Sequence, residues 1–189
     1  IQSARMQVYF IDNDDYFQHR LMTTDEEGKE YEDNGERAIF YARGVLETVK
    51  KLRWCPDIIH CHGWMSAVVP LFIKKAYYDE PSFRDSKVIF SVYGNGFQSN
   101  LVPNFKEQVL FRDITPEDLS MINDPVNHDE LCKLAITYSD GVIQNSENVN
   151  PAIMDYARSL NIPVVDYQPA DTYADACNAL YDKVWEEAE

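Results

Sequence analysis

Short apolar runs recur along the chain, and longer segments between them repeat apolar residues every three to four positions. The short runs are rich in β-branched and aromatic residues and predict strands; they are residues 6–11, 57–61, 87–92, 141–144 and 163–166. The longer segments predict helices; they run from 33 to just before Pro56, over 64–78, 104–111, 115–122, 128–138 and 150–160, and from 171 or 172 onward. Strands and helices therefore alternate along most of the chain.

This alternation predicts a parallel sheet whose strands are joined by right-handed helical crossovers. We therefore expect an α/β fold, a Rossmann-like three-layer α/β/α arrangement, in one domain that spans residues 1–189. A domain near this size buries roughly 70% of its unfolded surface, so it needs neither disulfides nor a metal for stability.

Two segments carry further local signals. Asp33 and Glu36 have the spacing of a capping box at the start of the first predicted helix. Residues 64–78 are apolar nearly all round, which predicts a largely buried helix. Between the first predicted strand and the first helix, residues 12–32 form a polar, acidic loop, and loops of this length are more often functional or mobile than structural.

Charge and cysteine usage narrow the class of protein. The formal net charge of −15 argues against a nucleic-acid partner and against anionic membranes, and it fits an uncharged substrate. The four cysteines are scattered without a C-x-x-C pair, which favours a reduced, cytoplasmic protein. We see no signal peptide and no apolar run long enough to span a bilayer.

Polar and aromatic residues gather where the predicted strands end. The carboxyl ends of parallel strands share one edge of a sheet, and ligands bind there. We therefore expect a cleft at this edge, with the loop 12–32 lying over it; its predicted lining is His62, Trp64, Tyr93, Asn95, Gln98, Asn145 and Asn148. Such a surface suits sugars, because aromatic rings stack on their CH faces and amides both donate and accept hydrogen bonds.

Several of the candidate residues can also be explained by a purely structural role. His60 and His62 lie on the same side of a strand; the pair has no third ligand with clear spacing, so we predict no metal site, and His60 is interpreted as a hydrogen-bonded core residue. Trp64 at a helix start is more typical of a core than of a ligand platform, and Asp33 can be explained as a helix cap alone. No dinucleotide or phosphate loop is present, so we predict no cofactor and disfavour a generic nucleotide-binding domain.

Several segments occur in the order and at the separations of one known family. Residues 8–12 look like its strand before a variable loop, and residues 33–37 look like its Asp-Asn-x-x-Arg-Phe helix start. Residues 56–65 look like its Pro-Asp-Val-Val-His-x-His-Asp-Trp-His motif, residues 87–92 like the strand before a Thr-x-His-Asn loop, and residues 139–142 like its Ala-Asp-x-Val. On these motifs the chain resembles the N-terminal, acceptor-side catalytic domain of bacterial glycogen synthase and plant starch synthase.

The resemblance implies a GT-B retaining hexosyltransferase that moves glucose from ADP-glucose to the non-reducing end of an α-1,4-glucan in glycogen biosynthesis. It implies an α-glucan or maltooligosaccharide as partner, and ADP-glucose only where a donor-binding domain is supplied. Asp33 is the position where a polar site residue of the family is kept.

The departures from the family pattern concern catalysis. The motif histidine that contacts the donor sugar falls on Met65, the preceding aspartate on Gly63, and the His-Asn pair on Tyr93 and Gly94. We expect the chain to lack the first strand with its Lys-x-Gly-Gly-Leu loop and the C-terminal donor-binding domain. The resemblance therefore predicts that this chain alone is inactive and assigns it no catalytic residue; the alternative is a non-catalytic glucan-binding or regulatory relative of the synthase.

Overall fold

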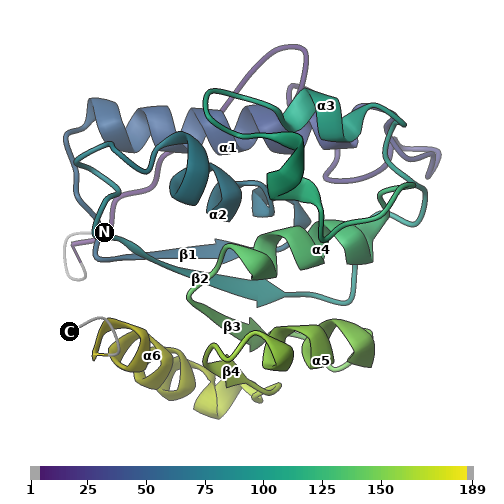
Figure 1. Cartoon of the computed structure of the whole chain (residues 1–189). Helices are drawn as coiled ribbons and strands as arrows, with labels where there is room; N and C mark the ends of the chain where they lie inside the picture. The colour runs from purple at the N-terminus through teal and green to yellow at the C-terminus, as the bar shows by residue number, and fades with distance from the viewer. Residues whose placement is uncertain (1–4, 187–189) are drawn as a thin grey trace.

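Four parallel strands form the centre of the structure, a computed structural model that describes residues 5–186. They are β1 (Ile58–His62), β2 (Lys87–Val92), β3 (Gly141–Gln144) and β4 (Val164–Val165), and they lie side by side in chain order (Figure 1). All four were predicted as strands, and the expected α/β fold is confirmed.

Helices connect and cover the strands. They are α1 (Asn34–Lys51), the 3₁₀ turn η2 (Trp64–Ser66), α2 (Val69–Leu71), the π-helical segment η3 (Phe72–Ala76), α3 (Phe105–Val109), the 3₁₀ turn η4 (Pro116–Leu119), α4 (His128–Thr137), α5 (Pro151–Ser159) and α6 (Ala170–Glu186). The predicted helix 64–78 is thus helical and buried, but three short segments of different winding replace a single α-helix.

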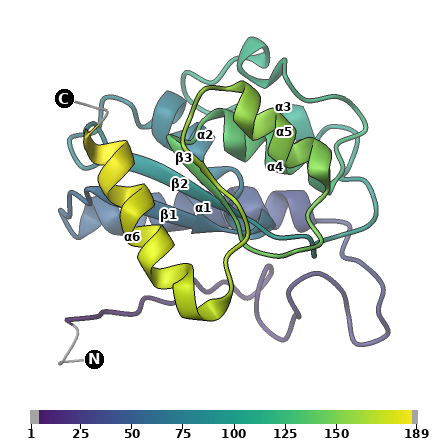
Figure 2. The ribbon, with the colours of Figure 1, turned by 90° about the horizontal axis from the view of Figure 1, so that it is seen from below.

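The order of the strands decides which face each helix covers. Every crossover moves in the same direction along the sheet, and right-handed crossovers in one direction place all their helices on the same face. The main core on that face contains residues of α1, α2, α4 and α5. After β4 the chain passes to the opposite face, where α6 crosses in front of the strands when the molecule is seen from that side (Figure 2).

Side chains alternate along the strands between these two faces, as the pleat requires. Cys61, Phe90 and Val142 belong to the main core, whereas their neighbours Ile89 and Ile143 pack beneath α6 with Leu180, Val184 and Cys177. The α6 face changes character along the strands: it is apolar at their amino ends, and it carries His60, His62, Ser91 and Tyr93 toward their carboxyl ends. At the carboxyl edge of the sheet, the face on the α6 side is therefore polar.

The predicted strand 6–11 is wrong. Residues 6–11 form no strand, and most of their side chains are exposed, Phe10 to 89%. β-propensity reflects the fit of a side chain to a pleated, half-buried surface, and none of the described strands pairs with this segment. Ile11 instead packs against Gly44 of α1, where a glycine leaves room for it.

The packing of α6 gives a stability prediction. Leu180 is 2% exposed and fills the space between α6 and the sheet, so Leu180→Ala should lower the free energy of unfolding by about 2–5 kcal/mol. Leu52→Ala, at a side chain 46% exposed, is the matched control and should change it by about 0.5 kcal/mol or less. Urea unfolding followed by circular dichroism measures both; equal effects would show that α6 does not pack as described.

Candidate functional site

A pocket of approximately 310 Å³ opens at the carboxyl ends of β1 and β2. It is lined by Met22, Thr23, His62, Gly63, Trp64, Met65, Tyr93, Asn95 and Gly96. The structure thus brings together His62, Trp64, Tyr93 and Asn95 of the predicted cleft, and the loop 12–32 reaches the same edge through Met22 and Thr23. Whether these residues bind a ligand stays a prediction.

The turn after β1 depends on a glycine. Gly63 has φ 70° and ψ −178°, a combination that is essentially restricted to glycine. Its N–H donates to Ser91 O at 3.2 Å, and its carbonyl accepts from Ser66 Oγ at 3.0 Å. An aspartate, which the family resemblance places here, would be strained in this backbone conformation.

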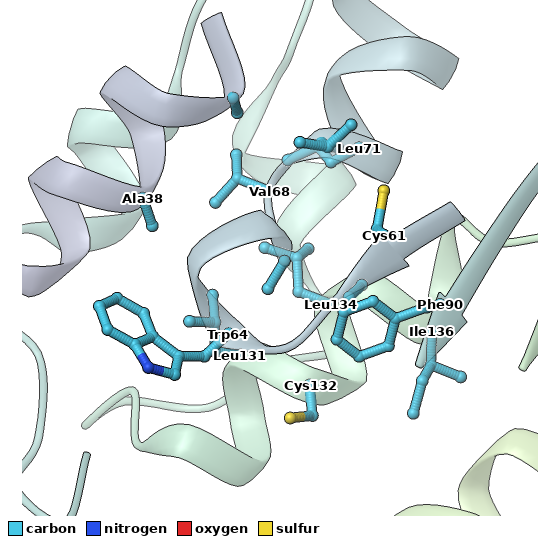
Figure 3. Close-up of a cluster of buried hydrophobic side chains, with 14 of the residues drawn as sticks. Ala38, Cys61, Trp64, Val68, Leu71, Phe90, Leu131, Cys132, Leu134 and Ile136 are labelled. Atoms are coloured by element: carbon cyan, nitrogen blue, oxygen red, sulfur yellow. The ribbon is translucent and has the colours of Figure 1, made fainter. Parts of the chain in front are cut away.

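Trp64 belongs mainly to the core. Its side chain is 5% exposed and meets Phe97 edge to face, with ring centroids 5.5 Å apart. It belongs to the same buried cluster as Ala38 of α1 and Leu131 of α4 (Figure 3). Met65, the next residue, is half-buried and lines the pocket. Trp64 therefore forms a wall of the pocket rather than an exposed platform.

His62 and Tyr93 supply polar atoms to the pocket from the α6 face of the sheet. Tyr93 Oη lies 3.0 Å from His62 Nδ1, and Asn145 bonds the same tyrosine hydroxyl. Burial lowers the pKa of His62 and raises the pKa of Tyr93, so both groups are uncharged at neutral pH. With no Asp, Glu, Lys or Arg in the lining, the pocket wall is electrically neutral.

His60 is hydrogen-bonded, as the sequence predicts, but its side chain is half-buried rather than enclosed in the core. Its Nδ1 lies 2.5 Å from Tyr181 Oη of α6, and its Nε2 lies 2.6 Å from Ser91 Oγ of β2. Burial, and then the charge of a protonated His62, lower the pKa of His60 to about 4. The ring is therefore neutral at pH 7, and both of its nitrogens are already hydrogen-bonded.

The loop 12–32 is held over the sheet edge by the buried guanidinium of Arg37. This side chain is 2% exposed and donates from Nε to Tyr16 O, from Nη1 to Met22 O and Asn34 Oδ1, and from Nη2 to Leu21 O, at 2.9–3.0 Å. The sequence predicted that this loop lies over the edge, but it did not predict that Met22 and Thr23 line the pocket, because their placement depends on backbone carbonyls that no side-chain pattern reveals.

Glu30 connects this loop to the loop that follows β2. Its carboxylate accepts hydrogen bonds from the backbone N–H groups of Gln98 and Ser99 and from the Ser99 hydroxyl. These bonds lower the pKa of Glu30. Both loops that border the pocket are therefore tied to each other as well as to the sheet.

Close approach of two other segments explains the glycines in the loop after β2. A Cβ atom on Gly94 would lie 2.3 Å from the Asn148 side chain, and one on Gly96 would lie 2.2 Å from the His128 ring. Asn145 and Asn148, predicted for the cleft, thus lie behind this loop and outside the pocket lining.

Asp33 and Gln98 are also placed outside the pocket lining. The Asp33 carboxylate pairs with both terminal nitrogens of Arg20, at 2.5 and 2.8 Å, which lowers its pKa. The predicted capping box is wrong: Asp33 makes no side-chain cap, and Glu36 accepts from Tyr16. Gln98 lines a neighbouring pocket of approximately 200 Å³ with Phe97, His128 and others. A binding role for either residue stays a prediction.

Residues 5–186 contain no group of three or more His, Cys, Asp or Glu side chains placed to hold a metal ion. Their four cysteines are free thiols, with Cys61, Cys132 and Cys177 buried and Cys55 exposed. None of the described helices is both long and apolar enough to cross a membrane.

The sheet, its crossovers and the pocket at the carboxyl edge define a Rossmann-like α/β domain of the kind found in GT-B glycosyltransferases. A family model described as the starch synthase catalytic domain matches residues 1–161, and the chain belongs to this family. The fold comparison agrees: the catalytic domain of starch synthase IV from Arabidopsis thaliana, bound to ADP and acarbose, superposes with a TM-score of 0.56 at 17% identity. That match covers 76% of this chain and 32% of the other.

Glycogen synthases are among its relatives. The enzyme of Pelodictyon phaeoclathratiforme is 35% identical over 128 residues, which are 67% of this chain and 26% of that protein. The enzyme of Clostridium perfringens is 32% identical over 163 residues, 82% of this chain and 29% of that protein. The chain thus spans about a quarter of the length of these relatives.

The buried guanidinium gives a prediction about the pocket loop. Arg37→Met should keep the aliphatic packing but leave the carbonyls of Tyr16, Leu21 and Met22 without a donor, lowering the free energy of unfolding by at least about 2 kcal/mol. Arg84→Met, at an exposed side chain, is the control and should change it by about 0.5 kcal/mol or less. Amide hydrogen exchange should increase in residues 16–23 of the Arg37 variant; unchanged protection there would contradict the anchoring role.

The lowered pKa of His60 gives a pH prediction. An unfolded histidine titrates near pH 6.5, whereas His60 in the fold titrates at about 4, so the unfolded chain binds more protons between these values. Its contribution to stability is complete above about pH 6.5 and is lost as the pH falls to about 4. His60→Gln should therefore flatten the fall in unfolding free energy across this window, measured by urea unfolding at several pH values.

The exposed His19 provides the control for that measurement. His19→Gln should leave the pH dependence as in the unmodified chain. A His60→Gln slope equal to that of the unmodified chain would mean that His60 is not held neutral by the fold.

Proposed function

We propose that this chain is the acceptor-side half of a glycogen or starch synthase-like glucosyltransferase, and that its pocket receives a glucose unit of an α-1,4-glucan. The observation that carries the proposal is the neutral lining: hydroxyl, imidazole and amide groups alternate with aromatic and aliphatic surface and no formal charge intervenes. Membership in the starch synthase catalytic domain family supports the choice of glucan.

The physical fit is to a sugar hydroxyl array. Asn95 and Thr23 can each donate and accept hydrogen bonds, and His62 and Tyr93 add an imidazole and a phenol. The volume lies near the lower end of the range of about 300–1,000 Å³ for ligand pockets, which favours a single terminal sugar over a long glucan segment.

The same lining does not suit the diphosphate of ADP-glucose. Phosphate groups are bound by arginine and lysine through charge-assisted hydrogen bonds, and neither residue lines this pocket. Met65 stands where the family resemblance places a histidine that contacts the donor sugar, so a charge-stabilising contact of a few kcal/mol in the transition state is missing. We infer that the 189 residues do not transfer glucose by themselves and that ADP-glucose binding requires a donor domain.

A second candidate is a glucan-binding relative without catalysis. Two observations favour it: Met65 cannot replace an imidazole chemically, and Gly63 adopts a backbone conformation that the family's aspartate would avoid. Both candidates share the glucan pocket and differ in whether a donor domain restores glucose transfer.

Binding at the pocket is tested by titrating the chain with maltotriose in a calorimeter. Asn95→Ala removes one donor–acceptor pair and should weaken binding about two- to twelvefold, the range expected for one net hydrogen bond. Asn178→Ala removes the same side chain from an exposed position of α6 and should leave the affinity unchanged. No heat from correctly folded protein, or equal losses in both variants, would contradict a glucan site here.

Catalysis is tested by following transfer of glucose from ADP-glucose to glycogen by the purified chain. We expect no turnover above a protein-free control. Turnover that is abolished by Met65→Ala would show that this chain is a competent transferase and that the thioether replaces the motif histidine.

A further inference from the structure

Helix α6 packs on the apolar part of its face of the sheet and reaches the polar part through Tyr181. It spans Ala170–Glu186, beyond residues 1–161 that match the family model, so the family match assigns it no role. Tyr181 of this helix places its hydroxyl 2.5 Å from His60 Nδ1, and the two rings meet edge to face at 5.6 Å. A helix outside the family match therefore contacts a motif histidine.

His60 is held at both of its ring nitrogens. Ser91 Oγ lies 2.6 Å from Nε2, on the opposite side of the ring from Tyr181. A neutral imidazole has one N–H donor and one acceptor, so one hydroxyl must donate and the other must accept. The phenol is the more acidic hydroxyl; we therefore assign Tyr181 as the donor to Nδ1 and place the ring proton on Nε2, where it is donated to Ser91.

His62 is in turn fixed by His60. The two side chains leave the same side of β1, and their rings stack with centroids 4.1 Å apart and an interplanar angle of 21°. Asn145 bonds the Tyr93 hydroxyl in a way that favours its phenolate oxygen as acceptor, which leaves the Tyr93 O–H to donate to His62 Nδ1 at 3.0 Å. The proton of His62 is then on Nε2.

We propose that Tyr181 is a positioning residue of the pocket: by fixing His60 it holds the stacked His62 ring in the orientation in which Tyr93 donates to Nδ1, and that bond then selects one tautomer. In that state Nε2–H of His62 is a donor without an acceptor among the described residues, available to a hydroxyl of a sugar in the pocket that His62 lines. The ligand in this inference rests on the proposed glucan site, whereas the contacts that lead from Tyr181 of α6 to His60 and from the His60 ring to the stacked His62 ring do not.

The test compares Tyr181→Phe with Tyr156→Phe in the full chain. The first change removes only the hydroxyl that bonds His60; the control removes a hydroxyl that bonds Thr137 Oγ1 at 2.7 Å on the other face of the sheet. Long-range ¹H–¹⁵N spectra of the imidazoles at pH 7 report the tautomer of each histidine. We expect His62 to be a single Nε2–H tautomer in the unmodified chain and in Tyr156→Phe, and to show averaged nitrogen shifts in Tyr181→Phe.

Maltotriose affinity is measured on the same three proteins. Tyr181→Phe should weaken it about two- to tenfold, up to the value of one net hydrogen bond, and Tyr156→Phe should not change it. Unchanged His62 signals in Tyr181→Phe would overturn the inference, and so would altered signals with unchanged affinity. If the unmodified chain binds no maltotriose, the glucan proposal fails, and the spectra alone decide whether Tyr181 positions His62.

Discussion

The carboxyl edge of the sheet, where the pocket lies, depends on the hydrogen bonds of the buried Arg37 guanidinium. A charged group out of contact with water must be compensated by hydrogen bonds, and here the backbone carbonyls of the loop 12–32 supply three of them. The loop consequently adopts the path that brings Met22 and Thr23 to the pocket, and Glu30 then ties its far end to residues 98 and 99. Through these hydrogen bonds, one residue of α1 places part of a long acidic loop in the lining of the pocket.

The order of the strands in the sheet determines how the rest of the site is built. Because β1 to β4 follow one another in space, their crossovers fill one face with an apolar core and leave the other face to α6 among the described residues. That second face is apolar at the amino ends of the strands and polar at their carboxyl ends. The polar part contains the hydrogen-bonded, uncharged side chains of His60, Ser91 and Tyr181. Because His60 stacks on His62, which lines the pocket, this part contacts the pocket without a formal charge.

The sequence was a good guide where local pattern determines structure. The buried strands, most helices and the meeting of His62, Trp64, Tyr93 and Asn95 at one edge follow from apolar periodicity and parallel topology. It failed for residues 6–11, whose strand-like composition has no described strand to pair with, and for the Asp33–Glu36 capping box, because Arg20 and Tyr16 of the preceding loop bind those carboxylates. It also missed Met22 and Thr23. Each failure depends on which segments meet in the fold and which do not, and short-range patterns do not contain that information.

Backbone amide NMR of the ¹⁵N-labelled chain most directly tests the proposal that the pocket binds a glucan and that its lining, which contains no arginine or lysine, does not bind the diphosphate donor. Maltotriose and ADP-glucose are added to separate samples, and the shifted amide signals are placed on the structure. We predict that maltotriose shifts the signals of residues 22–23, 62–65 and 93–96, and that ADP-glucose leaves them in place. The reverse, shifts at these residues with ADP-glucose and none with maltotriose, would contradict it.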